Sequence, residues 1–340
     1  MRLKLKPLAE QVVVITGASS GIGLATARAA SARGASVVLV ARNEEVLQQV
    51  RREIEAAGGR ADAVAADVGD PDQVEAVVAA AEVRFGGFDT WVNDAGVGIY
   101  GELEKVAFAD HERLFRTNYF GVVNGTLAAV RHLRARGEPG AVINVGSVLS
   151  DVGSPMLGAY AASKHAVKGF TESLRMELIR EKAPVSLSLI KPSSISTPFP
   201  EHMKNLTDAT PQVPPVRYAP EVVADAILHA ATHPVRQMTV GFGSRPMVLT
   251  TAAAPPIADR LFARLIPPLS RRRGRDWPDD GLRSPTYDGH TETPAYRGRR
   301  FSLYTEVQKH PMLALGAGLA LAGAAMWLPL RGRRQIFTTS

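Results

Sequence analysis

The sequence predicts an α/β fold built on a doubly wound parallel sheet with helices on both faces. Two observations predict it. Short β-branched apolar runs alternate with helical patterns along most of the chain, and parallel strands need such crossover helices. A glycine-rich turn also joins the first apolar run to the first helical pattern, as at a nucleotide-binding edge.

The elements follow from apolar periodicity, taken in order along the chain. We expect strands at 12–15, 36–40, 63–66, 91–92, 141–145, 185–190 and 237–240. We expect helices at 22–32, 44–57, 72–83, 111–134, 159–179 and 221–232. A Pro/Ser/Thr-rich stretch at 192–215 interrupts this alternation, and its length is typical of a lid or a substrate-binding segment.

Composition divides the chain into a large domain over residues 1–270, a basic Pro/Gly/Arg-rich extended linker over 271–310, a transmembrane helix over 311–330 and a basic tail over 331–340. The third segment has twenty residues without a charge, which is enough to span a bilayer core. Its glycines and alanines leave a buried or intersubunit apolar helix as the alternative. The amphipathic piece 261–266 either rests on a membrane surface or packs on the domain.

Composition and charge exclude several functions. The chain has no cysteine, which removes disulfides, thiolate metal sites and cysteine nucleophiles. The histidine pair His229 and His233 lacks the glutamate of a zinc hydrolase helix, so we predict no metal site. Residues 271–340 carry a net +6 of the total charge of +7. Because the body is nearly neutral, we do not expect nucleic-acid binding, and the basic tail indicates a linker or a membrane.

A phosphate-binding cradle is predicted directly after the first strand, where the sequence Thr16-Gly17-Ala18-Ser19-Ser20-Gly21-Ile22-Gly23 opens the first helix. Glycines permit a tight turn and let backbone N–H groups approach a pyrophosphate at a helix N-terminus. A glycine-rich pattern alone is weak evidence, but its place between a strand and a helix makes the predicted fold Rossmann-like. The candidate cofactor-binding residues here are Gly17, Ser19, Ser20, Gly21, Ile22 and Gly23.

The end of the second strand indicates which cofactor binds. The sequence Val40-Ala41-Arg42-Asn43 offers no carboxylate for a ribose 2′-hydroxyl, and Arg42 could pair with a 2′-phosphate instead. The alternative is that Arg42 is a solvated residue at the start of the next helix. We predict NADP(H) rather than NAD(H).

A proton-transfer site is predicted from Tyr160 and Lys164, which share one helix face at a spacing of four. An ammonium beside a phenol lowers the phenol pKa from about 10 and suits it to exchange a proton with a substrate oxygen. Ser147 follows the strand 141–145 at its carboxyl end, where it could hold that oxygen. Each of these residues also has an ordinary structural interpretation when it is taken alone. The spacing of Tyr160 and Lys164 could be a coincidence, and Ser147 could be a turn residue. Asn118, a polar residue in an apolar helical stretch, could be a core amide whose hydrogen bonds are all satisfied.

Together these motifs resemble the short-chain dehydrogenase/reductase family over residues 9–242. They occur in the family's order: the glycine-rich cradle, Asp67-Val68, Asn93-Asp94-Ala95-Gly96, Asn118, Ser147, and Tyr160 with Lys164. The resemblance implies a tetrad. In it Tyr160 is the acid/base, Lys164 lowers its pKa and holds the nicotinamide ribose, Ser147 positions the substrate and Asn118 supports a water relay.

The same resemblance implies further contacts with the cofactor. Asp67 and Val68 would contact adenine, the residues from Asn93 to Gly96 would line the cofactor, and Ile195 and Thr197 would meet the nicotinamide amide. The residues implied are Asp67, Val68, Asn93, Ala95, Gly96, Pro192, Ile195 and Thr197. Two positions depart from the family pattern. Asp94 replaces the more usual second Asn, which matters little if the backbone keeps its shape, and Ser193 follows Pro192 where Gly is typical. The resemblance also implies a homo-oligomer.

The sequence therefore predicts an NADP(H)-dependent oxidoreductase that transfers a hydride between its cofactor and a carbonyl or alcohol. The C-terminal segment suggests an apolar or lipid-like substrate, and a membrane-associated protein with its catalytic domain in the cytoplasm. Two alternatives remain. One is an epimerase or dehydratase that uses a tightly held cofactor, and the other is a non-catalytic cofactor-sensing scaffold on the same fold.

Overall fold

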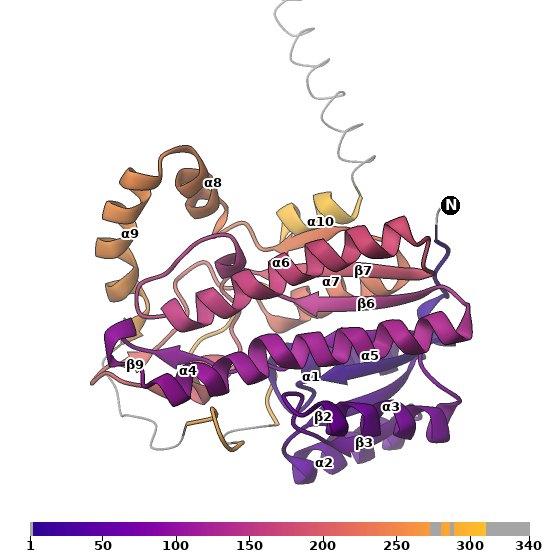
Figure 1. The fold of residues 1–340 in the computed structure, drawn as a ribbon. Coiled ribbons are helices and arrows are strands. Elements are labelled where there is room, and N and C mark those ends of the chain that lie inside the picture. The colour runs from indigo at the N-terminus through magenta and orange to yellow at the C-terminus, as the bar shows by residue number, and fades with distance from the viewer. Residues whose placement is uncertain (1–2, 273–279, 286–288, 311–340) are drawn as a thin grey trace, which may run out of the picture.

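The computed structural model describes residues 3–272, 280–285 and 289–310. Its centre is a seven-stranded sheet of order β10-β7-β6-β4-β1-β2-β3, in which every neighbouring pair is parallel (Figure 1). The strands are β1 Val12–Thr16, β2 Ser36–Ala41, β3 Arg60–Ala65, β4 Thr90–Asn93, β6 Gly140–Val145, β7 Val185–Pro192 and β10 Gln237–Val240. The predicted parallel sheet is confirmed.

Helices cover both faces of this sheet because alternate residues of each strand point to opposite sides. In β1, Val13 and Ile15 belong to one buried core and Val14 belongs to the other. The first core lies under α1 Gly21–Ala32, α2 Glu44–Ala56 and α7 Pro220–Thr232. The second lies under α3 Pro71–Phe85, α5 Gly121–Arg136 and α6 Gly158–Arg180. The doubly wound, Rossmann-like arrangement is therefore confirmed.

The helix predicted over 111–134 is interrupted. α4 Phe108–Phe115 and α5 are joined by a π-helical turn, Arg116–Phe120, with one residue more per turn than an α-helix. The wider turn buries Asn118 completely, against the backbone of Val97. The amide of Asn118 is fully used in this position, which explains why the chain leaves regular α-helical geometry here.

The stretch predicted as a lid or substrate-binding segment is held by short ladders on two sides. It contains the 3-10 turn η5 Phe199–His202 and two short strands, β8 Lys204–Asn205 and β9 Thr210–Pro211. β8 pairs with β5 Ile99–Tyr100, and β9 pairs with β11 Arg271–Arg272. The other 3-10 turns are η1 Leu8–Glu10, η2 Leu103–Lys105 and η4 Val148–Ser150.

After β10 the chain forms two helices that project from the body, α8 Arg245–Ala253 and α9 Pro255–Leu269 (Figure 1). The described part of 280–310 then packs against the domain, which differs from the extended linker expected from composition. Leu282 is fully buried, and in α10 Leu303–Lys309 the side chain of Gln308 pairs with both backbone groups of Thr239 in β10. Composition misleads here because polar and backbone hydrogen bonds, rather than apolar periodicity, attach the segment.

The predicted transmembrane helix 311–330 and the tail 331–340 lie outside the described residues. Within the part of the chain that the structure does describe, no helix is both long enough and apolar enough to cross a bilayer.

Candidate active site

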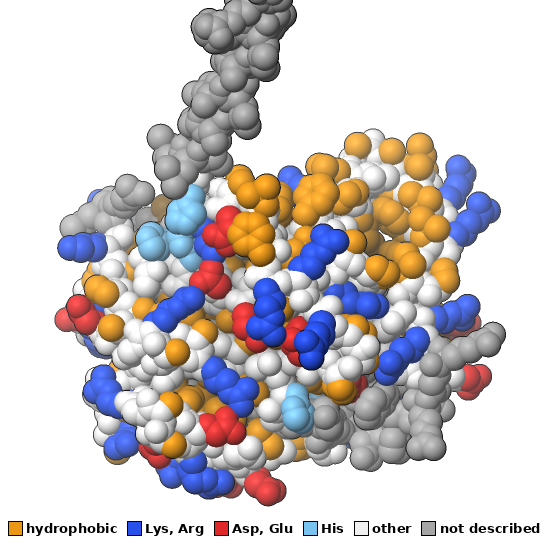
Figure 2. All heavy atoms as spheres, turned by 180° about the vertical axis from the view of Figure 1, so that it is seen from behind, with side chains coloured by type: hydrophobic (Ala, Val, Ile, Leu, Met, Phe, Trp, Pro, Cys, Tyr) orange, Lys and Arg blue, Asp and Glu red, His pale blue; other side chains and the backbone are white. Residues whose placement is uncertain are grey.

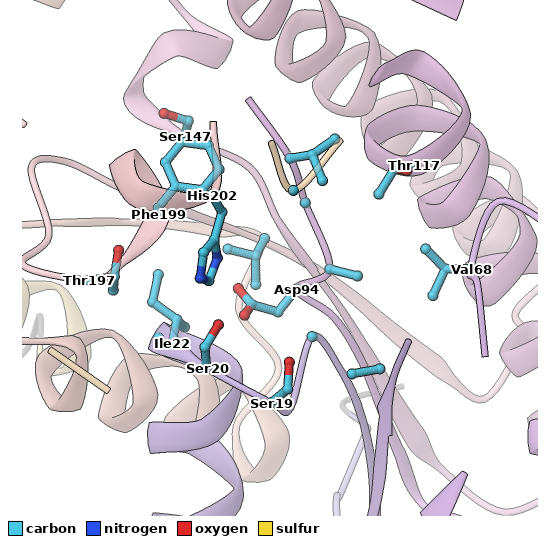
Figure 3. Close-up of a pocket in the computed structure, with 18 of the residues that line it drawn as sticks. Ser19, Ser20, Ile22, Val68, Asp94, Thr117, Ser147, Thr197, Phe199 and His202 are labelled. Carbon is cyan, nitrogen blue, oxygen red and sulfur yellow. The ribbon is translucent and has the colours of Figure 1, made fainter. Parts of the chain in front are cut away.

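A pocket opens at the carboxyl ends of the parallel strands, beside the point where the chain order reverses between β1 and β4 (Figure 3). This is where open α/β sheets bind their ligands. It gathers residues from segments that lie far apart in the sequence. The predicted residues that line it are Gly17, Ser19, Ser20, Gly21, Ile22, Arg42, Asp67, Val68, Ala95, Gly96, Ser147, Tyr160, Lys164, Pro192, Ile195 and Thr197.

The cradle needs its glycines for close approach. Gly17 has φ +74°, and a Cβ there would lie 2.9 Å from the backbone nitrogen of Ala95. A Cβ on Gly23 would lie 2.1 Å from the carbonyl oxygen of Gly17. Gly23 was predicted as a cofactor contact, but it is absent from the pocket lining and packs beneath the turn instead. Its role in this structure is to let the first helix start directly against the strand end.

Two buried hydroxyls in the pocket wall support a polar ligand. Thr117 Oγ1 and Ser193 Oγ line the pocket, and neither has a hydrogen-bond partner among the described residues. A buried hydroxyl without a partner costs free energy, which a bound molecule with polar edges would recover. Together with the glycine cradle, these groups fit a dinucleotide in the pocket.

The proton-transfer cluster is assembled as the spacing predicts. The Ser147 hydroxyl lies beside that of Tyr160, and Ser147 Oγ accepts from Leu149 N at 3.1 Å, which fixes its position. Lys164 Nζ lies 5.6 Å from the centroid of the Tyr160 ring. The Phe199 ring packs on the same tyrosine, with centroids 5.2 Å apart. Tyr160 is thus held between a hydroxyl, an ammonium and an apolar ring.

The electrostatics of the cluster differ from the prediction. Burial raises the pKa of the Tyr160 hydroxyl above its ordinary value, and the neighbouring Ser147 hydroxyl lowers this pKa by a smaller amount. Lys164 Nζ donates to Val145 O at 2.8 Å, and the lowering of the Tyr160 pKa that was expected from Lys164 stays a prediction. Burial lowers the pKa of Lys164 itself to about 8, and the neighbouring Asp94 carboxylate opposes this. The protonated phenol is therefore the favoured form at neutral pH.

Asp94 adds an ionisable group that the family pattern lacks. Figure 3 shows its side chain directed into the pocket. Burial raises the pKa of Asp94 to about 7, while the Lys164 ammonium and the Gly23 backbone N–H lower it. The backbone nitrogens of Asp94 and Ala95 both donate to Thr16 Oγ1, at 3.1 and 3.2 Å. The backbone is held, as expected, but the substitution also changes the charge of the site.

Besides Gly23, two predicted residues lie outside the pocket lining, Asn118 and Asn93. Asn118 Oδ1 accepts from Val97 N at 2.8 Å, and its Nδ2 donates to Val97 O and to Ser163 Oγ. Asn93 Nδ2 donates to Asn144 Oδ1 at 2.8 Å, deep between the strands. Both amides therefore brace the elements that carry the site. The predicted contact of Asn93 with the cofactor and the predicted water relay of Asn118 both stay predictions.

Some pocket residues were not predicted individually. Phe199 and His202 lie on η5, within the stretch predicted to bind substrate. Gly281 and Pro285 come from the C-terminal extension, by which we mean the described residues that follow β10. Arg42 Nη2 donates to Gly281 O at 2.6 Å. The length of the stretch after β7 indicates that Phe199 and His202 could reach the pocket. No local pattern places Gly281 and Pro285 there, because their position depends on contacts with residues more than 200 positions earlier, such as Arg42.

Comparisons with known proteins agree with this site. The model of the short chain dehydrogenase family matches residues 11–206. The uncharacterized oxidoreductase YxnA of Bacillus subtilis (strain 168) is 43% identical over 332 residues, covering 95% of this chain and 93% of that protein. The fatty acyl-CoA reductase of Acinetobacter baylyi is 32% identical over 255 residues, covering 74% of this chain and 83% of that protein.

A solved structure of a short chain dehydrogenase/reductase from Burkholderia phymatum in complex with NAD superposes with a TM-score of 0.69 at 26% identity. It covers 74% of this chain and 96% of that one. The parallel sheet, the glycine cradle and the Ser147, Tyr160 and Lys164 cluster all occur at the positions expected from the sequence motifs. The chain belongs to the short-chain dehydrogenase family of oxidoreductases.

Proposed function

We propose that the chain is an NADP(H)-dependent oxidoreductase that interconverts a carbonyl and an alcohol on an apolar, lipid-like substrate. One observation carries this proposal. Ser147, Tyr160 and Lys164 line the same pocket as the glycine cradle, with the Ser147 hydroxyl and the Lys164 ammonium beside the phenol. When bound, a nicotinamide cofactor supplies or accepts the hydride.

The residues of the chain then handle the proton. Tyr160 gives its hydroxyl proton to the substrate oxygen in reduction and takes one back in oxidation. Ser147 hydrogen-bonds the same oxygen and aligns it with the phenol. Because burial keeps Tyr160 protonated at neutral pH, its resting form is the donor needed for reduction. The positive charge of Lys164 stabilises the phenolate left after the transfer.

The proposed preference for NADP(H) depends on Arg42. The Burkholderia phymatum structure contains NAD, so the family fold alone does not select the phosphorylated cofactor. In this chain Arg42 lines the pocket at the end of β2, where hydrogen bonds to Gly281 O and Leu282 O hold its guanidinium. A guanidinium pairs well with a phosphate through parallel N–H donors.

Arg42→Ala tests this preference. We expect the ratio of kcat/KM for NADPH over NADH to fall by about tenfold or more, because a charge-assisted pair with the 2′-phosphate is lost. Arg60→Ala, at an exposed position on β3, is the control and should leave the ratio unchanged. A wild-type chain that prefers NADH, or an unchanged ratio in Arg42→Ala, would contradict the proposal.

The activity itself is tested with the purified full chain, NADPH and a series of ketones, aldehydes and fatty acyl derivatives of increasing chain length. We expect net oxidation of NADPH, with kcat/KM increasing with chain length. Net oxidation of free cofactor would exclude an epimerase or dehydratase with a bound cofactor. The absence of cofactor oxidation or reduction with every carbonyl and alcohol tested would refute the proposal.

An exposed apolar face supports the lipid-like substrate and membrane association. Figure 2 shows hydrophobic side chains gathered over the α8 and α9 pair, and those exposed are Leu249, Ile257, Leu261, Leu265 and Leu269. The same helices and β11 carry five arginines, Arg245, Arg260, Arg264, Arg271 and Arg272, and one carboxylate, Asp259. An apolar helix face with a basic edge fits an anionic membrane surface. β11 pairs with β9, so this face adjoins the segment at the pocket.

Membrane association is tested by sedimentation of the full chain with anionic phosphatidylserine vesicles and with phosphatidylcholine vesicles. The variant Leu261→Glu with Leu265→Glu should bind anionic vesicles several-fold more weakly and keep its activity on a short water-soluble ketone. Met176→Glu with Ile179→Glu is the matched control, because these two residues are also exposed, at 65% and 69%, but lie on α6. Equal binding by both double variants would contradict the role of the α9 face.

A further inference from the structure

One segment of the C-terminal extension lines the pocket. We call the described residues 280–285 and 289–293 the C-terminal strap. Gly281 and Pro285 of the strap line the pocket together with the cradle and the ends of the strands. The family model ends at residue 206, whereas the match to YxnA spans 95% of the chain and therefore reaches into the C-terminal extension.

The strap is bonded to the wall of the pocket that carries the cradle. Gly21 N donates to His290 O at 2.9 Å, and Gly289 N donates to Ser19 O at 2.8 Å. Gly21 is the first residue of α1, so the strap lies directly against the predicted phosphate-binding turn.

The strap also holds the end of the pocket where β2 and β3 finish. Leu282 O accepts from Arg42 Nη1 and, at 3.0 Å, from Arg113 Nε. Arg113 Nη2 in turn donates to Asp67 Oδ2 at 2.7 Å. The carbonyls of Gly281 and Leu282 together hold Arg42, and Leu282 O connects it through Arg113 to Asp67, which also lines the pocket.

The opposite wall, formed by the segment after β7, is bonded to the same strap. Gly281 N donates to His202 O at 3.0 Å, and Thr293 N donates to Ser196 O at 3.0 Å. The Leu282 side chain is fully buried in a small cluster with Val97, Ile99, Leu114 and Ala159. The strap thus joins two walls of the pocket through buried and hydrogen-bonded contacts at both ends.

We propose that the C-terminal strap is part of the cofactor site, where it fixes Arg42 and slows the release of bound nicotinamide nucleotide. This inference rests on the proposed function. The strap forms a wall of the pocket and does not fill it, because the cradle, Tyr160 and the ends of the strands line the same pocket together with it. Separating the walls to release a nucleotide breaks several of the hydrogen bonds above at once.

Two variants are expected to loosen the strap while the proton-transfer residues themselves stay unchanged. Leu282→Ala removes its buried anchor, and Gly281→Ala places a Cβ 2.6 Å from His202 O, so the strap must move. The controls are Leu303→Ala, at a residue 68% exposed on α10, and Gly153→Ala, where an added Cβ meets nothing within 4 Å. NADPH release from the full chain is followed by stopped-flow fluorescence, with NADH in parallel.

We expect both strap variants to release NADPH roughly fivefold to tenfold faster than wild type, since changes of this kind act mainly on dissociation. Both controls should match wild type. Unchanged NADPH release in the strap variants would overturn the inference. Tighter NADPH binding in these variants would overturn it as well, because it would mean that the strap competes with the nucleotide for the N–H groups of the cradle. A wild-type chain that binds neither nucleotide would refute the proposed function as well, whereas wild-type binding with unchanged release refutes only the strap.

Discussion

The sheet domain and the C-terminal extension are built by different rules. In the domain, apolar residues recur with the period of a strand or a helix and fill two cores on either side of the sheet. In the extension, α8 buries no residue and α9 buries only Ala258. The segment after them is attached largely through carbonyls and polar side chains. Periodic burial of apolar residues can be predicted from a sequence, whereas attachment through backbone carbonyls and single polar side chains cannot.

The two regions also contribute different parts of the proposed function. The proton-transfer residues and the cradle belong to the domain, while the extension borders the pocket and presents an exposed apolar face. If this division holds, variants in the domain should abolish chemistry or cofactor binding. Variants in the extension should change retention of the cofactor or association with a membrane.

Tyr160→Phe should have the largest effect. Removing the hydroxyl removes the proton donor, so kcat should fall by about 10³-fold, within the range for general acid–base catalysis. NADPH affinity, measured by fluorescence titration, should change little, because the ring and Lys164 remain. Substantial turnover in Tyr160→Phe would show that another group transfers the proton, and it would contradict the assignment of proton transfer to this residue of the sheet domain.

Gly23→Ala should come next. The added Cβ would lie 2.1 Å from Gly17 O, so the cradle must open. We expect NADPH affinity to fall by at least roughly tenfold, because the N–H groups that would face a pyrophosphate are displaced. Gly169→Ala is the matched control, as a helical glycine whose Cβ would meet nothing within 4 Å. Unchanged NADPH affinity in Gly23→Ala would mean that the turn after β1 does not hold the nucleotide.

Much of the site could be predicted because its signals are local. Tyr160 and Lys164 meet through helix spacing, and Ser147 and the cradle follow strand ends that share one edge of the sheet. The hydrogen bond between Asn93 and the neighbouring strand was not predicted, because a polar residue near a strand end can face either a ligand or another strand. Asn93 faces Asn144. Only the three-dimensional contacts distinguish these two cases.

The raised pKa of Asp94 was missed for a different reason. The family pattern indicated that only the backbone shape mattered at this position, and that shape is indeed held by Thr16. A carboxylate, however, also responds to burial and to the charge of Lys164, and neither can be evaluated before the fold is known. Asp94 therefore links the two halves of the pocket, the cradle through the Gly23 N–H and the catalytic lysine through its charge.

Asp94→Asn should give the smallest effect, a shift of the pH profile. The Asp94 carboxylate raises the pKa of Lys164 against burial, which lowers it to about 8. Without the carboxylate the pKa of Lys164 falls further, so the ammonium is lost at a lower pH. We expect the alkaline limb of kcat/KM to move to lower pH by about one unit, within the usual range for loss of a nearby opposite charge.

The profile is measured from pH 5 to 10 with saturating NADPH, and Asp62→Asn on β3 is the control with no expected shift. The two groups titrate as a pair, so the wild-type profile reports apparent values for both. Below pH 6 the wild-type Asp94 is mostly protonated, since its pKa is raised to about 7, and the wild type and Asp94→Asn should then have similar activity. If their profiles coincide at alkaline pH as well, the charge of Lys164 does not depend on Asp94, and the electrostatic link between the cradle and the catalytic residues is absent.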